Sequence, residues 1–185
     1  MVVIRQPKMV VMLLAIKGAR LVKRLMLYFY LIIKRGRPCG VILGMSTPQE
    51  GQHHDLFEIQ TLFNEICAIL KKANINLDGL FLNADPGFDS QAFRDACESE
   101  NIIPNVKPNP RNSVEKEPKL SPIGTTIFDE ELYKDRSVIE HSNAWIDGFK
   151  ALLIRFEFSV RNWSALHFIA FSVIFLRKIN KKIKV

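Results

Sequence analysis

The chain has 185 residues, of which 48% are hydrophobic, and these values suit one domain with a substantial core. The formal net charge is +7 and the sequence pI is about 9.4, which is typical of proteins that bind nucleic acid or an anionic surface. Nine of the 26 Lys and Arg residues precede Glu50, the first acidic residue, so the basic pI comes from the N-terminal segment. The three cysteines are widely spaced and include no C-x-x-C pair, which excludes a zinc ribbon and fits a reducing cytoplasm.

Residues 1–40 mix apolar runs with Lys and Arg pairs and show neither helix caps nor a coherent periodicity. The run Met9–Ile33 is interrupted by four basic residues, and Ala165–Leu176 is short, so neither reaches the roughly 18 apolar residues of a membrane span. A signal peptide would need a cleaner apolar run and a small-residue cleavage site. We therefore predict a cytoplasmic protein with no membrane-spanning segment.

From residue 41 onward, strand and helix patterns alternate along the chain. Residues 41–46 predict a short strand, and residues 48–51 predict a turn. Apolar residues at helical spacing predict a helix over 55–72, for which Asp55 serves as the cap. The adjacent pair His53–His54 is then interpreted as solvent-facing rather than as part of a metal cluster.

Two further strands and a helix are predicted in the middle of the chain. Residues 79–83 predict a buried strand, residues 91–100 a helix capped by Ser90, and residues 102–106 a third strand. The segment 107–124 is rich in Pro, Asn, Lys and Ser, which predicts an irregular loop.

The C-terminal third predicts two long helices, over 129–149 and 163–179, and the second is followed by a basic tail. Strands that alternate with helices indicate an α/β layer fold. Four residues are predicted to be buried in the core of this fold, namely Trp145, Trp163, Cys67 and Cys97.

Two acidic residues stand where chemistry is expected. Asp85 directly follows a buried strand, which is where open α/β sheets bind their ligands. Glu140 belongs to the pattern Tyr133-x2-Arg136-x3-Glu140, whose members share one face of a helix. Taken alone, Asp85 also fits a loop residue that begins a turn, and Glu140 also fits a solvated helix face with an Arg–Glu pair.

Three segments, in this order, resemble the catalytic domain of DDE-type transposases of bacterial insertion sequences. Residues 45–59 (MSTPQEGQHHDLFEI) resemble the strand, turn and helix between the first two aspartates of that family. Residues 80–112, which begin LFLNADPGFDS, resemble its second-aspartate region. Residues 128–179 resemble its C-terminal signature, in which a Tyr-x2-Arg-x3-Glu helix supplies the third acid. The resemblance covers about Gly44–Lys178 and implies an incomplete ribonuclease-H-like α/β fold with a mixed sheet and long C-terminal helices.

The resemblance also implies a role for each candidate residue. Asp85 and Glu140 would be the second and third catalytic carboxylates, and both would bind Mg²⁺ or Mn²⁺. Two such ions can activate the attacking oxygen and stabilise the leaving oxygen when a DNA strand is cut and joined. Tyr133 and Arg136 would lie near the scissile phosphate. The other implied DNA-binding residues are Lys107, Arg111 and Lys150.

Two of these roles have alternatives. Related families place a Lys seven residues after the Glu, where this chain has Asp147, and Lys150 is the nearest base. Lys107 and Arg111 equally fit ordinary solvated positions in a loop.

The first aspartate of the family has no counterpart in this sequence. No acid precedes Glu50, and Asp55 is a poor substitute because it begins a helix. We therefore expect residues 1–40 to lie outside the family segment, either out of frame or disordered, and residues 41–185 to form a partial DDE catalytic domain. A frame that starts one base earlier could encode a family-like peptide there. The alternative for residues 1–40 is a genuine basic arm that binds DNA or a membrane.

The function predicted from these features is that of a transposase fragment, of the kind a pseudogene encodes, which binds transposon-end DNA. We expect it to be inactive alone because two carboxylates cannot hold the two-metal geometry, unless another product supplies the missing strand. One alternative is a non-catalytic DNA-binding fragment that modulates a full-length transposase or forms a homo-oligomer. A basic membrane-surface protein is the other, although we expect no membrane partner. A sheet without its first two strands would be open on one side, which predicts poor solubility.

Overall fold

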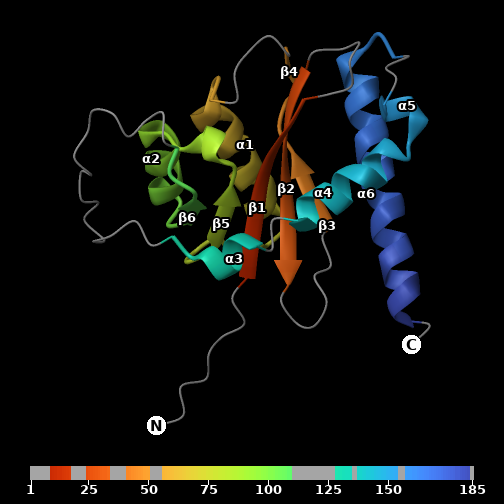
Figure 1. The fold of residues 1–185 in the computed structure, drawn as a ribbon. Helices are drawn as coiled ribbons and strands as arrows, with labels where there is room; N and C mark the ends of the chain where they lie inside the picture. The colour runs from red at the N-terminus through yellow and green to blue at the C-terminus, as the bar shows by residue number, and fades with distance from the viewer. Residues whose placement is uncertain are drawn as a thin grey trace.

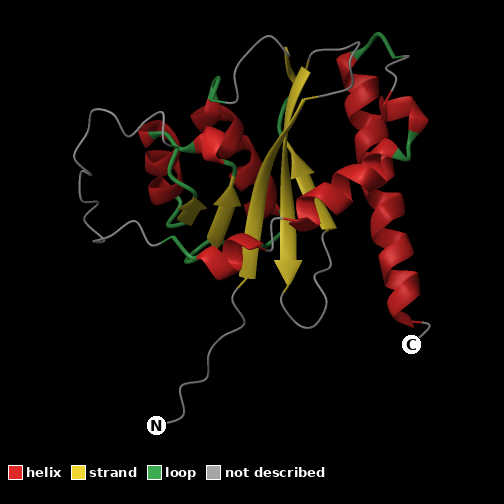
Figure 2. Cartoon of the chain, in the orientation of Figure 1, coloured by secondary structure: helices red, strands yellow, loops and turns green. Residues whose placement is uncertain are grey.

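The computed structural model describes residues 9–17, 24–33, 41–50, 56–109, 128–134, 137–153 and 157–183. These residues form a mixed sheet that is covered by helices on both faces, as Figure 1 and Figure 2 show. The α/β class and the mixed sheet predicted from the sequence are confirmed.

The sheet formed by the described residues has six strands, and five of them follow the order β3-β2-β1-β5-β6. The first three strands form an antiparallel meander, whereas β1, β5 and β6 run parallel to one another. The two-residue strand β4 pairs with β2 away from this path. The strands are β1 (Met9–Lys17), β2 (Arg24–Ile33), β3 (Val41–Met45), β4 (Gln49–Glu50), β5 (Phe81–Ala84) and β6 (Ile103–Val106).

The N-terminal segment supplies the centre of the sheet. β1 pairs along its whole length with β2, from Met9 opposite Ile33 to Lys17 opposite Leu25, and its other edge pairs with β5. The sequence shows no coherent periodicity in residues 1–40, yet the structure describes two strands there, and β1 lies at the centre of the sheet. The physical reason is composition, because aliphatic and aromatic residues fit a strand that helices cover on both faces.

Strand β3 contains a bulge, and its residues contribute to the cores on both faces of the sheet. Phe29 pairs with Gly44 and Tyr30 with Ile42, so Leu43 is left out of the ladder. Leu43 packs toward the core beneath α1, whereas Ile42 belongs to the core on the opposite face. Gly44 allows a close approach here, since a Cβ atom at this position would lie 3.3 Å from Cγ2 of Ile69.

Helices α1 (Ile59–Lys72) and α2 (Gln91–Ser99) cover one face. Apolar residues at helical spacing give α1 a continuous buried stripe, and the Phe63 ring meets Phe93 of α2 edge-on at 5.7 Å between centroids. Cys67 and Cys97 are buried in this core, as predicted.

The two helices differ in how well the sequence predicts their N-termini. Ser90 caps α2 as predicted, because its side chain accepts a hydrogen bond of 3.2 Å from the backbone N–H of Phe93. Helix α1 begins at Ile59 rather than at residue 55, after a turn over Leu56–Glu58 in which Glu58 has a φ of 48°. The predicted cap, Asp55, lies outside the described residues together with the His53–His54 pair.

The opposite face is covered by the C-terminal helices. The helix predicted over 129–149 is described as two helices, with residues 135–136 outside the description, and a tight turn at Gly148 leads into α5. Trp163 is buried as predicted, whereas Trp145 is 40% exposed, so its prediction as a core residue is wrong. The helices are α3 (Glu130–Lys134), α4 (Ser137–Asp147), α5 (Lys150–Leu153) and α6 (Val160–Ile183).

The core on this face joins the helices to the sheet. It contains Ile42 and Met45 of β3, Leu132 of α3 and Trp163 of α6, and Phe81 of β5 packs against it. None of the helices in the described ranges is long and apolar enough to cross a membrane.

Candidate nucleic-acid site at the end of β5

Asp85 is the first residue after β5, as the sequence predicts. It precedes the 3-10 turn η1 (Pro86–Phe88), and its carbonyl oxygen accepts a hydrogen bond of 2.9 Å from the N–H of Phe88. The Phe88 side chain is buried, so the backbone on both sides of Asp85 is anchored in the core. Asp85 as a whole is half-buried at the carboxyl end of a parallel strand, and its Oδ1 is shielded from solvent.

The strand next to Asp85 is β1. The two strands are parallel, with Met12 opposite Asn83, so the continued register brings β1 residue 14 level with Asp85. None of the nine residues of β1 is acidic. The neighbouring strand therefore contributes no second carboxylate beside Asp85.

The remaining predicted residues lie at several places in the fold. Tyr133 is in α3, and Glu140 is in α4 with its side chain outside the described part. Lys107 follows β6 and is exposed, and Lys150 is the exposed first residue of α5. Arg111 and Arg136 lie outside the described residues. Figure 1 shows α5 beside α6, on the β3 side of the sheet and away from β5, so Lys150 is not brought next to Asp85.

Two buried asparagines connect this end of the sheet to α3. Asn83 and Asn105 are neighbours in β5 and β6, and both side chains are fully buried. Asn105 donates a hydrogen bond of 2.7 Å from Nδ2 to Oδ1 of Asn83, which in turn donates one of 2.8 Å to the carbonyl of Leu132. Asn105 also bonds both backbone groups of Asp129, with distances of 3.0 Å to its carbonyl and 2.8 Å from its N–H.

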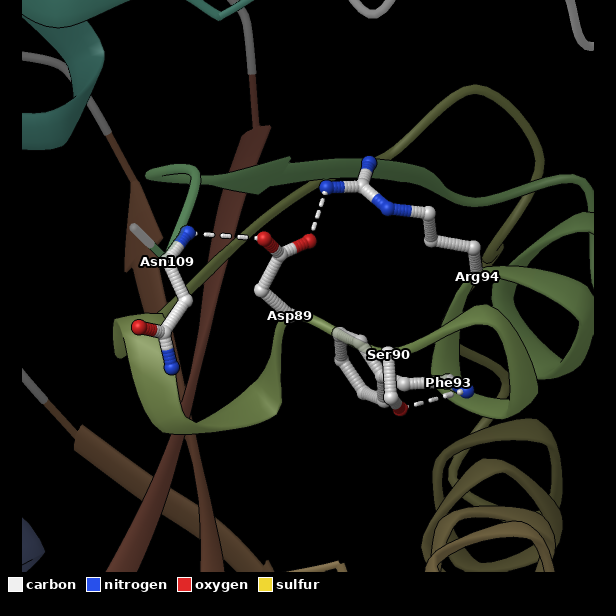
Figure 3. Close-up of polar contacts among 5 residues, drawn as sticks. All are labelled: Asp89, Ser90, Phe93, Arg94 and Asn109. Atoms are coloured by element: carbon white, nitrogen blue, oxygen red, sulfur yellow. Dashed lines mark hydrogen bonds and ion pairs between the residues drawn. The ribbon is translucent and has the colours of Figure 1, made fainter. Parts of the chain in front are cut away.

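A second polar cluster lies at the turn that leads from β5 to α2 and is drawn in Figure 3. Asp89 accepts a hydrogen bond of 2.8 Å from the backbone N–H of Asn109 and forms an ion pair of 2.6 Å with Arg94 of α2. One carboxylate thus joins the turn after β5, helix α2 and the loop that follows β6. Because Lys107 lies in that loop, Asp89 helps to fix the position of its backbone.

Neither cluster is recognisable in the sequence alone. An Asn within a short apolar strand has no local signal for a partner 22 or 49 residues away. Asp89 has the residue type and spacing of an ordinary turn residue before the α2 cap.

Tyr133 follows Leu132 directly and is half-buried. Its ring packs against Phe128 at 5.2 Å between centroids, and burial raises the pKa of its hydroxyl. Tyr133 therefore keeps its proton over a wider pH range than an exposed tyrosine, and it stands on the element that the two asparagines hold.

A two-metal centre needs several oxygen ligands that converge on one place. Among the described side chains, no group of three or more His, Cys, Asp and Glu residues could hold a metal ion. Asp85 offers the oxygen donors that Mg²⁺ prefers, but β1 adds none. The described residues therefore do not fit a two-metal centre.

Other titratable groups are buried away from this site. His167 of α6 is 2% exposed, and its Nδ1 lies 2.9 Å from the carbonyl oxygen of Trp163. Burial lowers the pKa of its imidazole, although the hydrogen bond to Trp163 opposes this shift. Burial also raises the pKa of the Cys67 thiol to about 12, so Cys67 is a core residue and not a nucleophile.

Comparison with known proteins gives distant structural similarity only. No family model matches the sequence. No curated protein matches it either.

Three solved structures are similar to the fold. A chain of the simian T-cell lymphotropic virus intasome in complex with PP2A regulatory subunit B56 gamma has a TM-score of 0.46 and 14% identity over 91% of this chain. The Thermus thermophilus RuvC structure has a TM-score of 0.33 and 10% identity, covering 70% of this chain and 79% of that one. The catalytic domain of Mos1 mariner transposase has a TM-score of 0.38 and 15% identity, covering 87% and 76% of the two chains.

The present chain spans 47% of the intasome chain. At these identities and TM-scores, the similarities by themselves carry no argument about chemistry.

Proposed function

We propose that this chain is a fragment of a DDE-type transposase catalytic domain of ribonuclease-H-like fold, which binds DNA but does not cut it. The observation that carries the proposal is the surroundings of Asp85. Asp85 directly follows β5, which pairs in parallel with β1, and β1 has no acid. Helix α3, which carries Tyr133, is held against β5 and β6. The order of these parts along the chain is the order that the motif resemblance requires.

The proposed inactivity follows from the donor set. When bound, two divalent ions supply activation of the attacking oxygen and charge stabilisation of the leaving oxygen. Asp85 and Glu140 are the proposed carboxylates for them, and the third, which would stand on β1, is missing. With two carboxylates the chain would supply fewer ligands than such a pair of ions needs.

DNA binding does not depend on that third carboxylate. We assign phosphate contacts to Lys107 and Arg111, and positions near the phosphate to Tyr133 and Arg136. Because α5 lies away from β5, we assign Lys150 a contact with a phosphate farther along the DNA. The exposed position of Lys107 directly after β6, on the strand next to Asp85, supports this assignment.

The proposal also covers residues 1–40, which we assign to an out-of-frame origin. Apolar residues of any origin can form strands such as β1 and β2, so the observed sheet is compatible with this assignment. The coding DNA tests it. An alternative frame interrupted by stop codons, or one with no family-like peptide, would rule out this origin.

A matched pair of lysines tests the DNA site. We expect Lys107→Gln to weaken binding of labelled double-stranded DNA and to reduce the slope of log K against log salt by about 1. Lys72→Gln is the control. Lys72 is also exposed, but it lies at the opposite end of β6 from Lys107. Its neighbour Lys71 pairs with Glu100, which comes before β6 begins. Equal effects of the two substitutions would show that binding is only a general property of a basic chain.

Strand cleavage is measured separately with supercoiled plasmid in Mg²⁺ and then in Mn²⁺. We expect no nicking above a mock preparation. Nicking that Asp85→Asn abolishes would contradict the proposed inactivity while supporting the site.

A further inference from the structure

The two buried asparagines form an arrangement that core packing does not explain. Burying an amide costs free energy unless the amide forms new hydrogen bonds. An apolar pair would fill the same space without that cost. Here both oxygens accept and both nitrogens donate hydrogen bonds, and the partners outside the pair are backbone groups of Asp129 and Leu132. Such bonds are directional, which apolar contacts are not.

These partners are the first residues of the C-terminal helical region. Asp129 precedes α3, and its carboxylate accepts a hydrogen bond of 2.9 Å from the N–H of Leu132. The Asn105 side chain bonds the backbone N–H and carbonyl of Asp129, as a neighbouring strand would. The Asn83 side chain donates to the carbonyl of Leu132. The beginning of α3 is therefore fixed at two points, one on β5 and one on β6.

We propose that Asn83 and Asn105 are positioning residues, which form an amide clamp that holds α3, and with it Tyr133, over the carboxyl ends of β5 and β6. As a role in a DNA site this rests on the proposed function, since Asp85 lies two residues after Asn83 and Lys107 lies two residues after Asn105. The clamp sets the distance between α3, which carries Tyr133, and the ends of β5 and β6. Asp85 follows the first of these strands and Lys107 follows the second.

The clamp is tested by the titration of Tyr133, because this tyrosine stands on α3 and its burial raises the pKa of its hydroxyl. Absorbance of tyrosinate is recorded against pH for the native full chain and for Asn105→Leu and Asn83→Asp. Each protein is paired with its Tyr133→Phe counterpart, so that the difference isolates Tyr133 from the other two tyrosines. We expect both substitutions to move the pKa of Tyr133 down toward the ordinary tyrosine range, and Asn105→Leu to have the larger effect because it removes both bonds between Asn105 and the Asp129 backbone.

A control separates positioning from stability. Leu62→Ala creates a cavity in the core beneath α1, on the other face of the sheet, and lowers the urea midpoint without touching α3. It should leave the Tyr133 titration unchanged. If Asn105→Leu lowers the urea midpoint but leaves that titration at its wild-type position, the clamp is overturned and Asn105 is only a core residue.

A second measurement needs no variant, in case Asn105→Leu does not fold. In the wild-type chain, the Asp129 amide is bonded to the buried Asn105 side chain, so we expect slow hydrogen exchange at that amide. Exchange as fast as that of an exposed loop amide would overturn the clamp. Neither measurement uses DNA or metal. The clamp can therefore be overturned while the Lys107 result supports the DNA site, and the DNA site can fail while the clamp is supported.

Discussion

A buried histidine gives the fold a defined sensitivity to acid. The imidazole of His167 is surrounded by Trp163 and Phe171, and burial lowers its pKa below the ordinary value of 6.5. The unfolded chain therefore takes up a proton at a pH where the folded chain does not. The stability contributed by neutral His167 is complete above about pH 6.5 and is lost as the pH falls below that value toward the folded-state pKa.

We expect the free energy of unfolding in urea to fall between pH 7 and pH 5, and His167→Gln to reduce this fall. His141→Gln is the control, since His141 is exposed on α4. An unchanged pH dependence in His167→Gln would show that another group is responsible.

Asp89 stabilises the fold, although its position in the sequence is that of an ordinary turn residue. Its two contacts, to Arg94 and to the N–H of Asn109, are short, and the side chains of Asp89 and Arg94 are only 15% and 21% exposed. Asp89→Asn removes the charge and should lower the free energy of unfolding by about 1–3 kcal/mol. Asp95→Asn, an exposed position on α2, should change it by less than about 0.5 kcal/mol in urea unfolding.

At the scale of elements, helix α2 is the best example of local prediction. Its cap at Ser90 and its buried Cys97 are where the sequence predicts them. Ser90→Ala should cost about 1 kcal/mol of stability, because it leaves the Phe93 N–H without its acceptor. Ser172→Ala on the exposed face of α6 removes a hydroxyl bonded only to the Phe168 carbonyl, and it should be neutral in the same urea measurement.

Elements were predictable where the apolar residues have a helical period or form a run of the length of one short strand, and β1 and β2 have neither signal. The stripes of α1 and α2 gave periodic signals, and β3, β5 and β6 ended within two residues of the predicted positions. β1 and β2 are apolar along their length, and such runs do not distinguish a strand from a buried helix. The ladder between them comes from tertiary pairing, which no local pattern contains.

The candidate site shows the same division. Asp85 was predictable because an acid interrupts the pattern directly after a buried strand. Asn83 and Asn105 were not, because their partners Leu132 and Asp129 are brought near only by folding.

At the scale of the whole molecule, β1 connects two halves that would otherwise be separate. It lies between β2 and β5, and only through it does the meander that ends in β3 join the parallel strands with Asp85. Both cores depend on this connection. Leu43 of β3 packs against the core that contains Leu82 and Ala84 of β5, and Phe81 of β5 packs on the core that contains Ile42 and Met45.

This connection predicts the effect of removing residues 1–40, which the sequence placed outside the domain. A chain of residues 41–185 would leave β3 and β5 with unpaired edges and would expose both cores, so we expect it to aggregate and to lose cooperative unfolding. A chain of residues 9–185 keeps both strands and should match the full chain in size-exclusion chromatography and urea unfolding. A soluble monomer of residues 41–185 with the urea midpoint of the full chain would instead show that β1 and β2 are dispensable. The domain would then begin at residue 41, as the motifs alone suggest.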